Sequence, residues 1–394
     1  MINKNYTIET IKTLEEIKEI KEDWQKLFYL KKDIPILFSF EVFKIYYETI
    51  IKNFHNVKIE IIVIKNKDKK IIAILPFTFE TKRYFNILSW RELSVKDEFL
   101  IRFYNFLIDP EEKPEIIFQE FLAHIKENKR KWDIIKIYSL AEDEKLIKIF
   151  TSIIGKYYKI IENVTNTLVI DCQREFEEYV KNDLDGKDLR ELKRKCRRLD
   201  EKGTITLLEM SESQEIEKGL PYFYEIEDSG WKGTGGTSLK RSYYGEFYQK
   251  IASHLTKEDK FRLYFLQINN EYIAGIYAII DRDILYLIKI GYSDAFSKYS
   301  PSKVLFYRVF EKLFSEKKIK KIDFHAPYQP FEKIFGTQTK KTYNITICNR
   351  KVLPTIYYIY LRILKKFGYP FAEDSRRWKI FTTITKRFYT RYNK

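Results

Sequence analysis

The sequence predicts an α+β protein built from two similar lobes, each a mixed, mostly antiparallel sheet flanked by helices. Three observations carry this prediction: the chain length, the order of strands and helices in the C-terminal half, and a comparable order in the N-terminal half. A chain of 394 residues is longer than one hydrophobic core usually supports, so we expect two lobes of roughly 150–200 residues. We place the lobes at 1–172 and 173–350, with a separate tail at 351–394.

The C-terminal lobe has the clearest pattern. Three runs rich in aromatic and branched residues alternate with short polar turns, which predicts an antiparallel meander. The runs are Phe261–Ile268, Tyr272–Ile280 and Ile284–Ile290. A helix is expected to begin at Pro301, because proline suits the first helical position and Ser300 is a favourable N-cap. The elements expected after it are a strand, a short helix and a final strand, at 320–324, 331–335 and 342–347.

The N-terminal lobe shows this order in diverged form. Its apolar runs predict strands at 57–64, 71–79, 85–90, 133–138 and 167–170. Helical patterns are expected at 115–129 and 142–156. Between the lobes, residues 175–202 are mostly helical and strongly basic. This segment is either a solvated face or a surface that meets an anionic substrate or carrier.

The composition excludes several classes of protein. A hydrophobic content of 44% excludes wholesale disorder. No run of apolar residues approaches the roughly 20 that span a bilayer. Residues 1–9 are polar and lack the apolar core of an export signal, so we expect a cytoplasmic protein. Three widely spaced cysteines fit neither a disulfide framework nor a zinc site, and the four histidines lack metal-ligand spacing, so no metal is expected.

The net charge of +16 predicts an anionic partner. The charge is concentrated in the tail, where residues 351–394 hold eleven Lys or Arg, eleven aromatic residues and two acids. Basic residues interleaved with aromatic ones suit an anionic membrane surface or an acyl carrier protein. A membrane role would make the protein peripheral at the inner membrane face. The alternative is a helix, expected at 356–367, that packs on the C-terminal lobe.

The segment from Lys289 to Phe306 is the most informative about function. A strand ends, a loop follows, and a helix opens with small residues and a lysine. Free backbone N–H groups and the helix dipole bind phosphate at such a helix start, as the pyrophosphate of coenzyme A requires. The predicted donor-binding residues are consecutive: Lys298, Tyr299, Ser300, Pro301, Ser302 and Lys303. The corresponding N-terminal helix follows Asp109–Glu115, whose acids would repel a pyrophosphate.

A second segment, Asp323–Lys333, supplies candidates for catalysis. Asp323 and His325 stand two apart on an expected strand and should share a face. We therefore predict them as the acid and base of an acyl transfer, which must remove a proton from the attacking amine or hydroxyl. Tyr328 and Lys333 are predicted to contact the acceptor.

The glycine-rich loop Asp228–Thr237 contains an unusual tryptophan. Either Trp231 anchors a surface loop in the core, or the loop faces a substrate. In the second case Trp231 and Lys232 line the acceptor side together with Lys289. The sequence has no phosphate-binding loop of the Walker type, no nucleophile elbow and no dinucleotide fingerprint, so an activated nucleophile is not expected.

In these residues the chain resembles the GNAT-fold acyltransferases that carry a cellulose-biosynthesis, or CelD-type, label. The resemblance extends from about Phe176 to Lys333. Its motifs are short: the basic helix before Gly203, Ser229–Gly233, Ile273–Gly275, Lys289–Lys303, and Asp323 with Lys333. Phe38–Phe40 and Ile72–Pro76 resemble the first lobe of that family. Ser302 stands where the family usually has glycine, and Glu332 where it has tyrosine.

The resemblance implies direct transfer of an acyl group from acyl-CoA to an amine or hydroxyl. The implied acceptor is a sugar or lipid-linked saccharide of cell-surface polysaccharide synthesis. The family is similar in turn to the Fem-type aminoacyl transferases, which share the double lobe and use aminoacyl-tRNA, so a tRNA donor is the main alternative. The other alternative is a non-catalytic protein that keeps the fold and binds an anionic surface.

Overall fold

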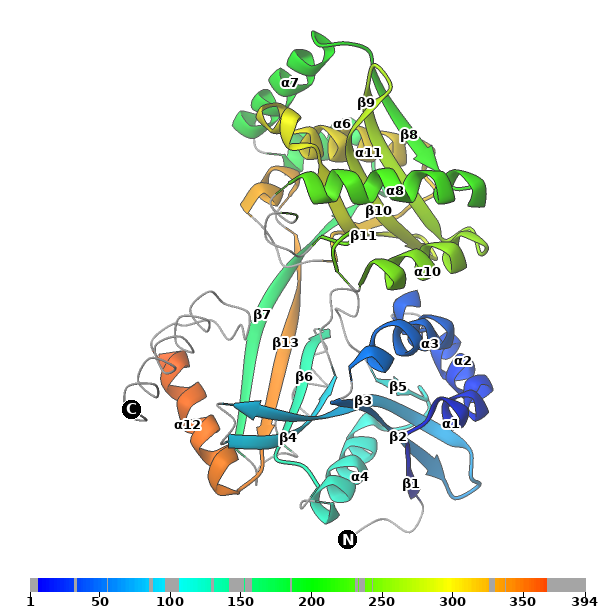
Figure 1. The fold of residues 1–394 in the computed structure, drawn as a ribbon, viewed down its shortest axis with the longest axis vertical. Coiled ribbons are helices and arrows are strands. Elements are labelled where there is room, and N and C mark those ends of the chain that lie inside the picture. The colour runs from blue at the N-terminus through cyan, green and yellow to red at the C-terminus, as the bar shows by residue number, and fades with distance from the viewer. Residues whose placement is uncertain are drawn as a thin grey trace. The chain divides into compact units, whose positions relative to one another are not determined.

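The computed structural model of the chain is shown in Figure 1. The described ranges are 6–31, 34–54, 56–84, 88–95, 106–128, 131–141, 152, 158–184, 186–230, 233, 238–242, 244–325, 330–336 and 338–366. The chain divides into two compact units, each assembled from separate stretches of sequence. Unit 1 comprises 1–32, 55–164 and 342–394, and unit 2 comprises 33–54 and 165–341.

An N-terminal segment belongs to unit 2, which differs from the predicted boundary at residue 172. This segment, 33–54, contains η1 (Ile36–Phe38) and α3 (Phe40–Thr49). The backbone N–H of Ile36 donates to the Asp281 carboxylate at 2.9 Å. The rings of Tyr46 and Phe247 lie 5.8 Å apart. These partners are more than 200 residues away along the chain, so no local pattern could have predicted the grouping.

A C-terminal segment belongs to unit 1, which differs from the predicted boundary at residue 350. β13 (Thr339–Cys348) pairs antiparallel with β6 (Ile134–Ala141). The following helix, α12 (Val352–Lys366), packs on β4 (Leu88–Val95). The tail helix therefore packs on the sheet of unit 1; the sequence had left open, as one alternative to a membrane role, that it packs on the C-terminal lobe.

The sheet of unit 2 confirms the predicted meander. β9 (Phe261–Ile268), β10 (Glu271–Asp281) and β11 (Ile284–Tyr292) pair antiparallel in sequence order. β8 (Ile205–Met210) pairs with β9 at one side. At the other side β12 (Lys321–Asp323) runs parallel to β11 and antiparallel to β7 (Tyr158–Asp171). β7 is much longer than the strand predicted at 167–170.

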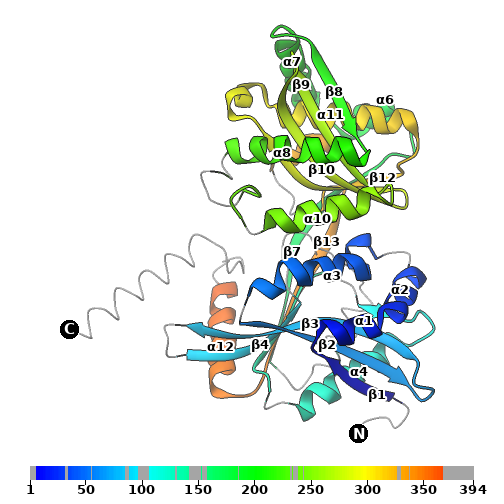
Figure 2. The same ribbon diagram turned by 45° about the vertical axis from the view of Figure 1, so that its right-hand side comes forward.

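Helices cover both faces of this sheet (Figures 1 and 2). α11 (Pro301–Glu316) packs with α6 (Phe176–Asp183) and α7 (Gly186–Asp200) on one face. α8 (Ser213–Ser229) and α10 (Tyr244–Thr256) cover the other. Side chains alternate along β9 to match: Tyr264 and Leu266 join the core beneath α11, whereas Phe265 lies beside Gly219 of α8.

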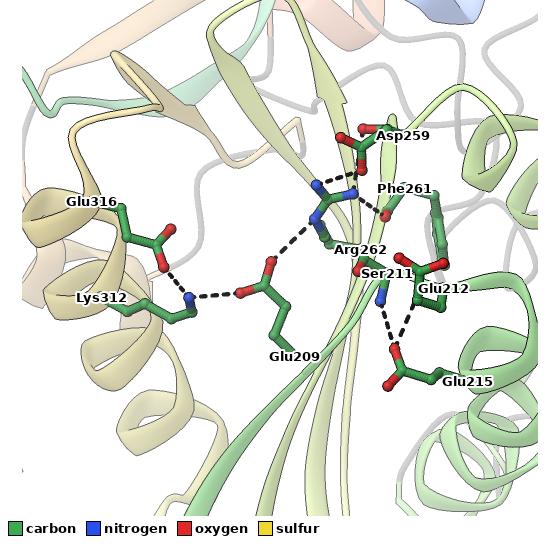
Figure 3. A network of polar contacts seen from close by, with 9 residues as sticks. All are labelled: Glu209, Ser211, Glu212, Glu215, Asp259, Phe261, Arg262, Lys312 and Glu316. Carbon is green, nitrogen blue, oxygen red and sulfur yellow. Dashed lines mark hydrogen bonds and ion pairs between the residues drawn. The ribbon is translucent and has the colours of Figure 1, made fainter.

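Helix α11 begins at the predicted Pro301 and buries the predicted face. That face consists of Phe306, Val309, Phe310 and Leu313. Figure 3 shows a network of charged side chains that links the C-terminal half of α11 to the sheet. Its members are Lys312 and Glu316 of α11, Glu209 of β8, and Arg262 with Asp259 at the start of β9. These ion pairs attach the C-terminal half of α11 to the sheet. The N-terminal end of α11 is part of the candidate site.

Unit 1 also contains a mixed sheet. Its first strands pair antiparallel in the order β1, β2, β3, β4, with bounds Tyr6–Ile11, Val57–Asn66, Ile71–Tyr84 and Leu88–Val95. β4 then pairs parallel with β6, and the short β5 (Leu107–Ile108) pairs with β3. The helices that the structure describes in unit 1 are α1 (Leu14–Glu19), α2 (Lys21–Leu30), α4 (Pro114–Glu127) and α12.

The predicted fold class, α+β with mixed and mostly antiparallel sheets, is confirmed. The helix predicted at 142–156 lies outside the described residues, apart from Ser152. Among the helices that the structure describes, none has both the length and the apolar character needed to cross a bilayer.

Candidate active site

The candidate site begins where two parallel strands part. β12 pairs with β11 at only three residues, Ile284 to Tyr286. β12 ends at Asp323, while β11 continues to Tyr292. Along residues 287–292, the side of β11 that faced β12 has no strand partner among the described residues. A strand edge is where an extended ligand can pair with a sheet. Within this segment the Tyr292 carbonyl already accepts from the Ser229 hydroxyl at 3.2 Å.

A β-bulge interrupts β11 beside this opening. Tyr277 of β10 faces Lys289, but the next residue, Ala278, faces Leu287. Ile288 is therefore the extra residue, and it takes no place in the ladder with β10. Four successive residues of β11, from Leu285 to Ile288, are buried, because helices cover both faces of the sheet. Bulges redirect side chains and free backbone groups, and they are frequent next to active sites.

The helix start that follows β11 has an unusual backbone. A 3-10 turn, η3 (Asp294–Tyr299), leads to Ser300 in the left-handed region, with φ 54° and ψ 53°. This conformation costs a non-glycine residue roughly 1 kcal/mol. Ser300 occupies the N-cap position as predicted, but its side chain makes no capping hydrogen bond. The first turn of α11 contains no acidic residue, so the helix dipole favours an anion there. Pro301 has no N–H, and the N–H groups of Lys303 and Val304 donate to the Ser300 carbonyl.

Lysines surround this helix start. Lys298 is exposed, with its Nζ 5.0 Å from the centre of the Tyr299 ring. Lys303 is half-buried in the first turn of α11. Lys195, from the basic helix α7, donates to the backbone carbonyl of Lys298 at 2.5 Å. The helix predicted as either a solvated face or an anion-facing surface therefore contacts the candidate phosphate loop.

Ser302 tests whether this helix start suits a phosphate ligand. Its hydroxyl is shielded from water and, within the described part of the chain, has no hydrogen-bond partner. A hydroxyl left without a partner is costly, and rotation about χ1 redirects it toward the loop. The residues present therefore fit an anion: they combine a donor without a partner, a helix N-terminus and nearby ammonium groups.

Asp323 and His325 lie together where β11 and β12 part. The backbone N–H of His325 donates to Asp323 Oδ1 at 2.8 Å, and both side chains are buried. Burial raises the pKa of the Asp323 carboxyl to about 6, although Lys340 and the His325 N–H oppose the shift. This pKa is suited to a base that works near neutral pH.

The predicted strand geometry of this pair was wrong. β12 ends at Asp323, and His325 has a left-handed φ of 45°, so no strand alternation relates the two side chains. A turn brings them together instead. The ring of Tyr286 packs edge-on against the His325 ring, with centres 5.6 Å apart. Sequence reasoning missed Tyr286, because it reads as an ordinary core position of β11.

The predicted acceptor residues have different outcomes. Lys289 is half-buried, with Nζ 5.1 Å from the centre of the Tyr248 ring of α10. Lys333 is exposed on η4 (Pro330–Phe335). Trp231, Lys232 and Tyr328 lie outside the described residues. These five residues remain predictions.

Glu227 is a buried carboxylate near the end of α8 that sequence reasoning also missed. It accepts from the Leu239 N–H at 2.8 Å. A side chain at Gly291 of β11 would meet the Glu227 backbone at 2.9 Å, so only glycine permits this approach of α8 to the open strand. The next residue, Asp228, binds Ser238 and Arg241. Glu227 and Asp228 therefore both bind residues that follow the glycine-rich loop. In the sequence, the acid directly before this loop is the feature that could have indicated such a role for Glu227.

None of the cysteines is an activated nucleophile. Burial raises the pKa of the thiols of Cys172 and Cys348 to about 12. Burial also raises the pKa of Cys196. Since the thiolate is the reactive form, these side chains are suited to packing and not to covalent catalysis.

Comparison with known proteins assigns part of the chain to a domain family. Residues 186–333 match the acetyltransferase (GNAT) domain family. This range includes the meander, α11 and the Asp323–Lys333 segment. No curated protein sequence matches the chain. A GNAT domain implies, in general terms, the use of an acyl-CoA.

Solved structures resemble the chain in fold over most of its length. FemX matches with a TM-score of 0.57 at 12% identity, covering 86% of this chain and 98% of that one. The C-terminal domain of an Agrobacterium fabrum protein named as a lysylphosphatidylglycerol synthetase matches with a TM-score of 0.51 at 11% identity, covering 88% and 95%. A tandem GNAT protein from the clavulanic acid biosynthesis pathway matches with a TM-score of 0.50 at 10% identity, covering 88% and 100%. With the domain match, this fold supports the predicted class, a GNAT-type acyltransferase.

Proposed function

We propose that the protein transfers an acyl group from acyl-CoA to an amine or hydroxyl, and that unit 2 carries the reaction. The observation that carries this proposal is that β11 continues beyond its pairing with β12 and leads to the start of α11, which has no acid in its first turn, two nearby lysines and the shielded Ser302 hydroxyl. An elongated ligand with amides at one end and phosphates at the other matches this arrangement. Acyl-CoA has that form.

The donor would lie along β11. Its pantetheine would run beside residues 287–292, where the β12 side of β11 has no strand partner among the described residues. Its pyrophosphate would meet the start of α11, where Lys298, Ser302 and Lys303 supply charge and hydrogen bonds. Lys195 contributes indirectly by holding the carbonyl of Lys298. In this arrangement the thioester lies near the bulge at Ile288, beside the parting strands.

The chemistry at the thioester needs one base. The acceptor nitrogen or oxygen attacks the carbonyl carbon, and the C–S bond breaks as coenzyme A leaves as a thiolate that takes up a proton. Asp323 is the candidate base, since its pKa of about 6 leaves it ionised at neutral pH. Because Asp323 is buried, the proton would reach it through a water molecule or the His325 imidazole.

We propose a sugar or lipid-linked saccharide as the acceptor, as in the CelD-type acyltransferases that the sequence resembles. Lys289 and the loop 228–237 would line the acceptor side, with Lys333 and Tyr328 as further candidates. Support for this assignment comes from the closeness of α8 to β11 at Gly291. That closeness brings the start of the glycine-rich loop next to the open strand, where an acceptor must approach the thioester.

Titration calorimetry with acetyl-CoA and longer acyl-CoAs tests the donor. We expect saturable binding that Lys303→Glu weakens at least tenfold, because a carboxylate at the helix start repels the pyrophosphate. Lys318→Glu is the matched control: it makes the same charge change at an exposed position beyond the other end of α11. Absence of binding to every acyl-CoA, or equal loss in both variants, would overturn the proposal.

An aminoacyl-tRNA-dependent transfer is the second candidate. It is favoured by the fold likeness to FemX and by the exposed basic face of α7, formed by Arg190, Lys193, Arg194, Arg197 and Arg198. Filter binding of tRNA across a salt series separates the two donors. Specific, saturable tRNA binding without acyl-CoA binding would favour this candidate. Binding to any polyanion with the same steep salt dependence would reflect charge alone.

A further inference from the structure

Helix α12 of unit 1 is apolar on two opposite faces. An amphipathic helix at a protein surface normally turns one apolar face to the core and a polar face to water. In α12 the inner face packs on the sheet of unit 1, and the outer face carries a second apolar stripe. The outer stripe has no function in the reaction proposed above.

The inner face of α12 is held by aromatic contacts. The rings of Tyr357 and Trp90 lie 5.2 Å apart, and those of Tyr358 and Tyr158 stack at 4.7 Å. Lys136 Nζ lies 5.4 Å from the centre of the Tyr357 ring. Leu361, one turn further along the helix, is buried. These contacts fix the rotation of α12 about its axis and therefore decide which side faces outward.

The outer stripe consists of Val352, Ile356 and Ile359. Their exposed fractions are 76%, 57% and 51%, so all three aliphatic side chains face water. Spacings of four and three residues place them within about 60° of one another around the helix, opposite Leu361. Such a row is unfavourable in water unless something covers it.

The charged residues of α12 and of the segment just before it are all basic. The sequence from Arg350 to Lys366 contains no Asp or Glu. Arg350 and Arg362 are exposed at the two ends of the stripe. Residues 367–394 add seven Lys or Arg and only two acids in sequence. A second copy of the chain would therefore bring like charge against like charge.

We infer that the outer face of α12 docks on an anionic lipid bilayer, with Val352, Ile356 and Ile359 inserted at the interface. Aliphatic residues on one side of a helix, flanked by cations, are the composition that binds the boundary between headgroups and acyl chains. The cations meet lipid phosphates, and the stripe removes apolar surface from water.

Vesicle co-sedimentation of the full chain tests this inference. The vesicles contain phosphatidylcholine alone, or phosphatidylcholine with 30% phosphatidylglycerol (about one anionic lipid in three). We expect binding to the anionic vesicles that salt weakens, and much weaker binding to the neutral ones. Ile356→Glu should reduce partitioning to the anionic vesicles about tenfold, since it replaces buried apolar surface with a repelled charge. Leu30→Glu is the matched control at an exposed leucine of α2.

Three outcomes would overturn the inference. In the first, the wild-type chain binds neither kind of vesicle. In the second, Ile356→Glu and Ile359→Glu bind the anionic vesicles as tightly as the wild type. In the third, Leu30→Glu loses as much binding as the two α12 variants. Sedimentation velocity tests whether a second copy of the chain covers the stripe instead. If the wild type is a dimer that does not bind vesicles, and Ile356→Glu converts it to a monomer, the stripe is a dimer interface. Because the stripe is exposed, thermal unfolding of the variants should stay within about 2 °C of the wild type.

Discussion

The helix start of α11 in unit 2 contrasts with that of α4 in unit 1. Both helices have proline at the first position. The first turn of α11 has no acid, whereas that of α4 has Glu115 and follows Asp109, Glu111 and Glu112. Although burial opposes it, the hydrogen bond from Lys70 lowers the pKa of Asp109 and keeps it ionised. The same local architecture thus repels anions in one unit and is suited to bind them in the other.

The two units also differ in how far their parallel strands stay paired. β4 stays paired with β6 to its last described residue, Val95. β11 instead leaves β12 after Tyr286 and opens an edge. Beside the closed pair, Glu92 is buried between two lysines, 3.0 Å from Lys82 and 3.3 Å from Lys136. Glu92 stands at the first residue of the β4–β6 pair, opposite Ile134, so this ion cluster lies at the start of the pair, whereas β11 separates from β12 at the end of theirs.

The largest expected effect concerns Asp323. As a base it contributes roughly 10²–10⁴-fold to the rate, so Asp323→Asn should lower kcat by about that factor while acyl-CoA affinity changes little. The wild-type rate should rise with pH through about 6, following the raised pKa of Asp323. Steady-state kinetics over pH 5–8, together with calorimetry, would check this. An unchanged kcat removes Asp323 from the reaction.

Asp323→Asn should also stabilise the fold, because it removes a buried carboxylate from unit 2. In unit 1, by contrast, the buried carboxylate of Glu92 is paired with two lysines, and its removal should destabilise the fold. The folded-state pKa of Asp323, about 6, lies above its ordinary value of 3.8, so folding takes up a proton between about pH 4 and pH 6. Stability is therefore lost as the pH rises through that window, by about 3 kcal/mol at most. Asp323→Asn should abolish this slope in urea unfolding curves. A slope that persists in the variant would assign it to another group.

A substitution at the helix start should separate binding from stability. Ser302→Asp makes α11 resemble α4 and should weaken acyl-CoA binding about 50-fold by charge repulsion. An acid near a helix N-terminus is otherwise favourable, but the Ser302 hydroxyl is shielded from water, so burial of the new carboxylate offsets that gain, and thermal unfolding must show that the variant folds. Glu115→Gln in α4 should leave acyl-CoA affinity unchanged. If calorimetry finds that Ser302→Asp binds normally, the phosphate does not lie at this helix start.

In unit 1 the corresponding change should affect stability alone. Glu92→Gln removes the carboxylate shared by Lys82 and Lys136 and should lower the unfolding free energy by about 3 kcal/mol, because Lys136 is buried. Acyl-CoA affinity should remain within about twofold of the wild type. Reduced affinity in a folded Glu92→Gln protein would contradict the division of roles between the units.

The smallest effect is expected at α7. Lys195→Met removes the hydrogen bond to the Lys298 carbonyl and should weaken acyl-CoA binding only about threefold, since Lys195 orders the loop without supplying the main charge. Arg194→Met, in an exposed ion pair with Glu191, is the control and should have almost no effect. Equal effects of the two substitutions would indicate a general contribution of charge.

The sequence by itself determined the meander of unit 2, the start of α11 at Pro301 and its buried face. These features follow from the spacing of apolar residues and from capping chemistry, which act over a few residues. The absence of acids at the start of α11 was also visible in sequence, because it depends only on residue identity. Local patterns therefore predicted both the elements and the charge of the candidate donor site.

Only the tertiary structure decided how distant segments combine. It paired β13 with β6, brought Lys195 to Lys298 across 103 residues, and joined Asp323 to His325 through a left-handed turn. The bulge at Ile288 and the parting of β11 from β12 likewise arise from strand register. Such features depend on contacts between residues far apart in sequence, and their energies have no local signature.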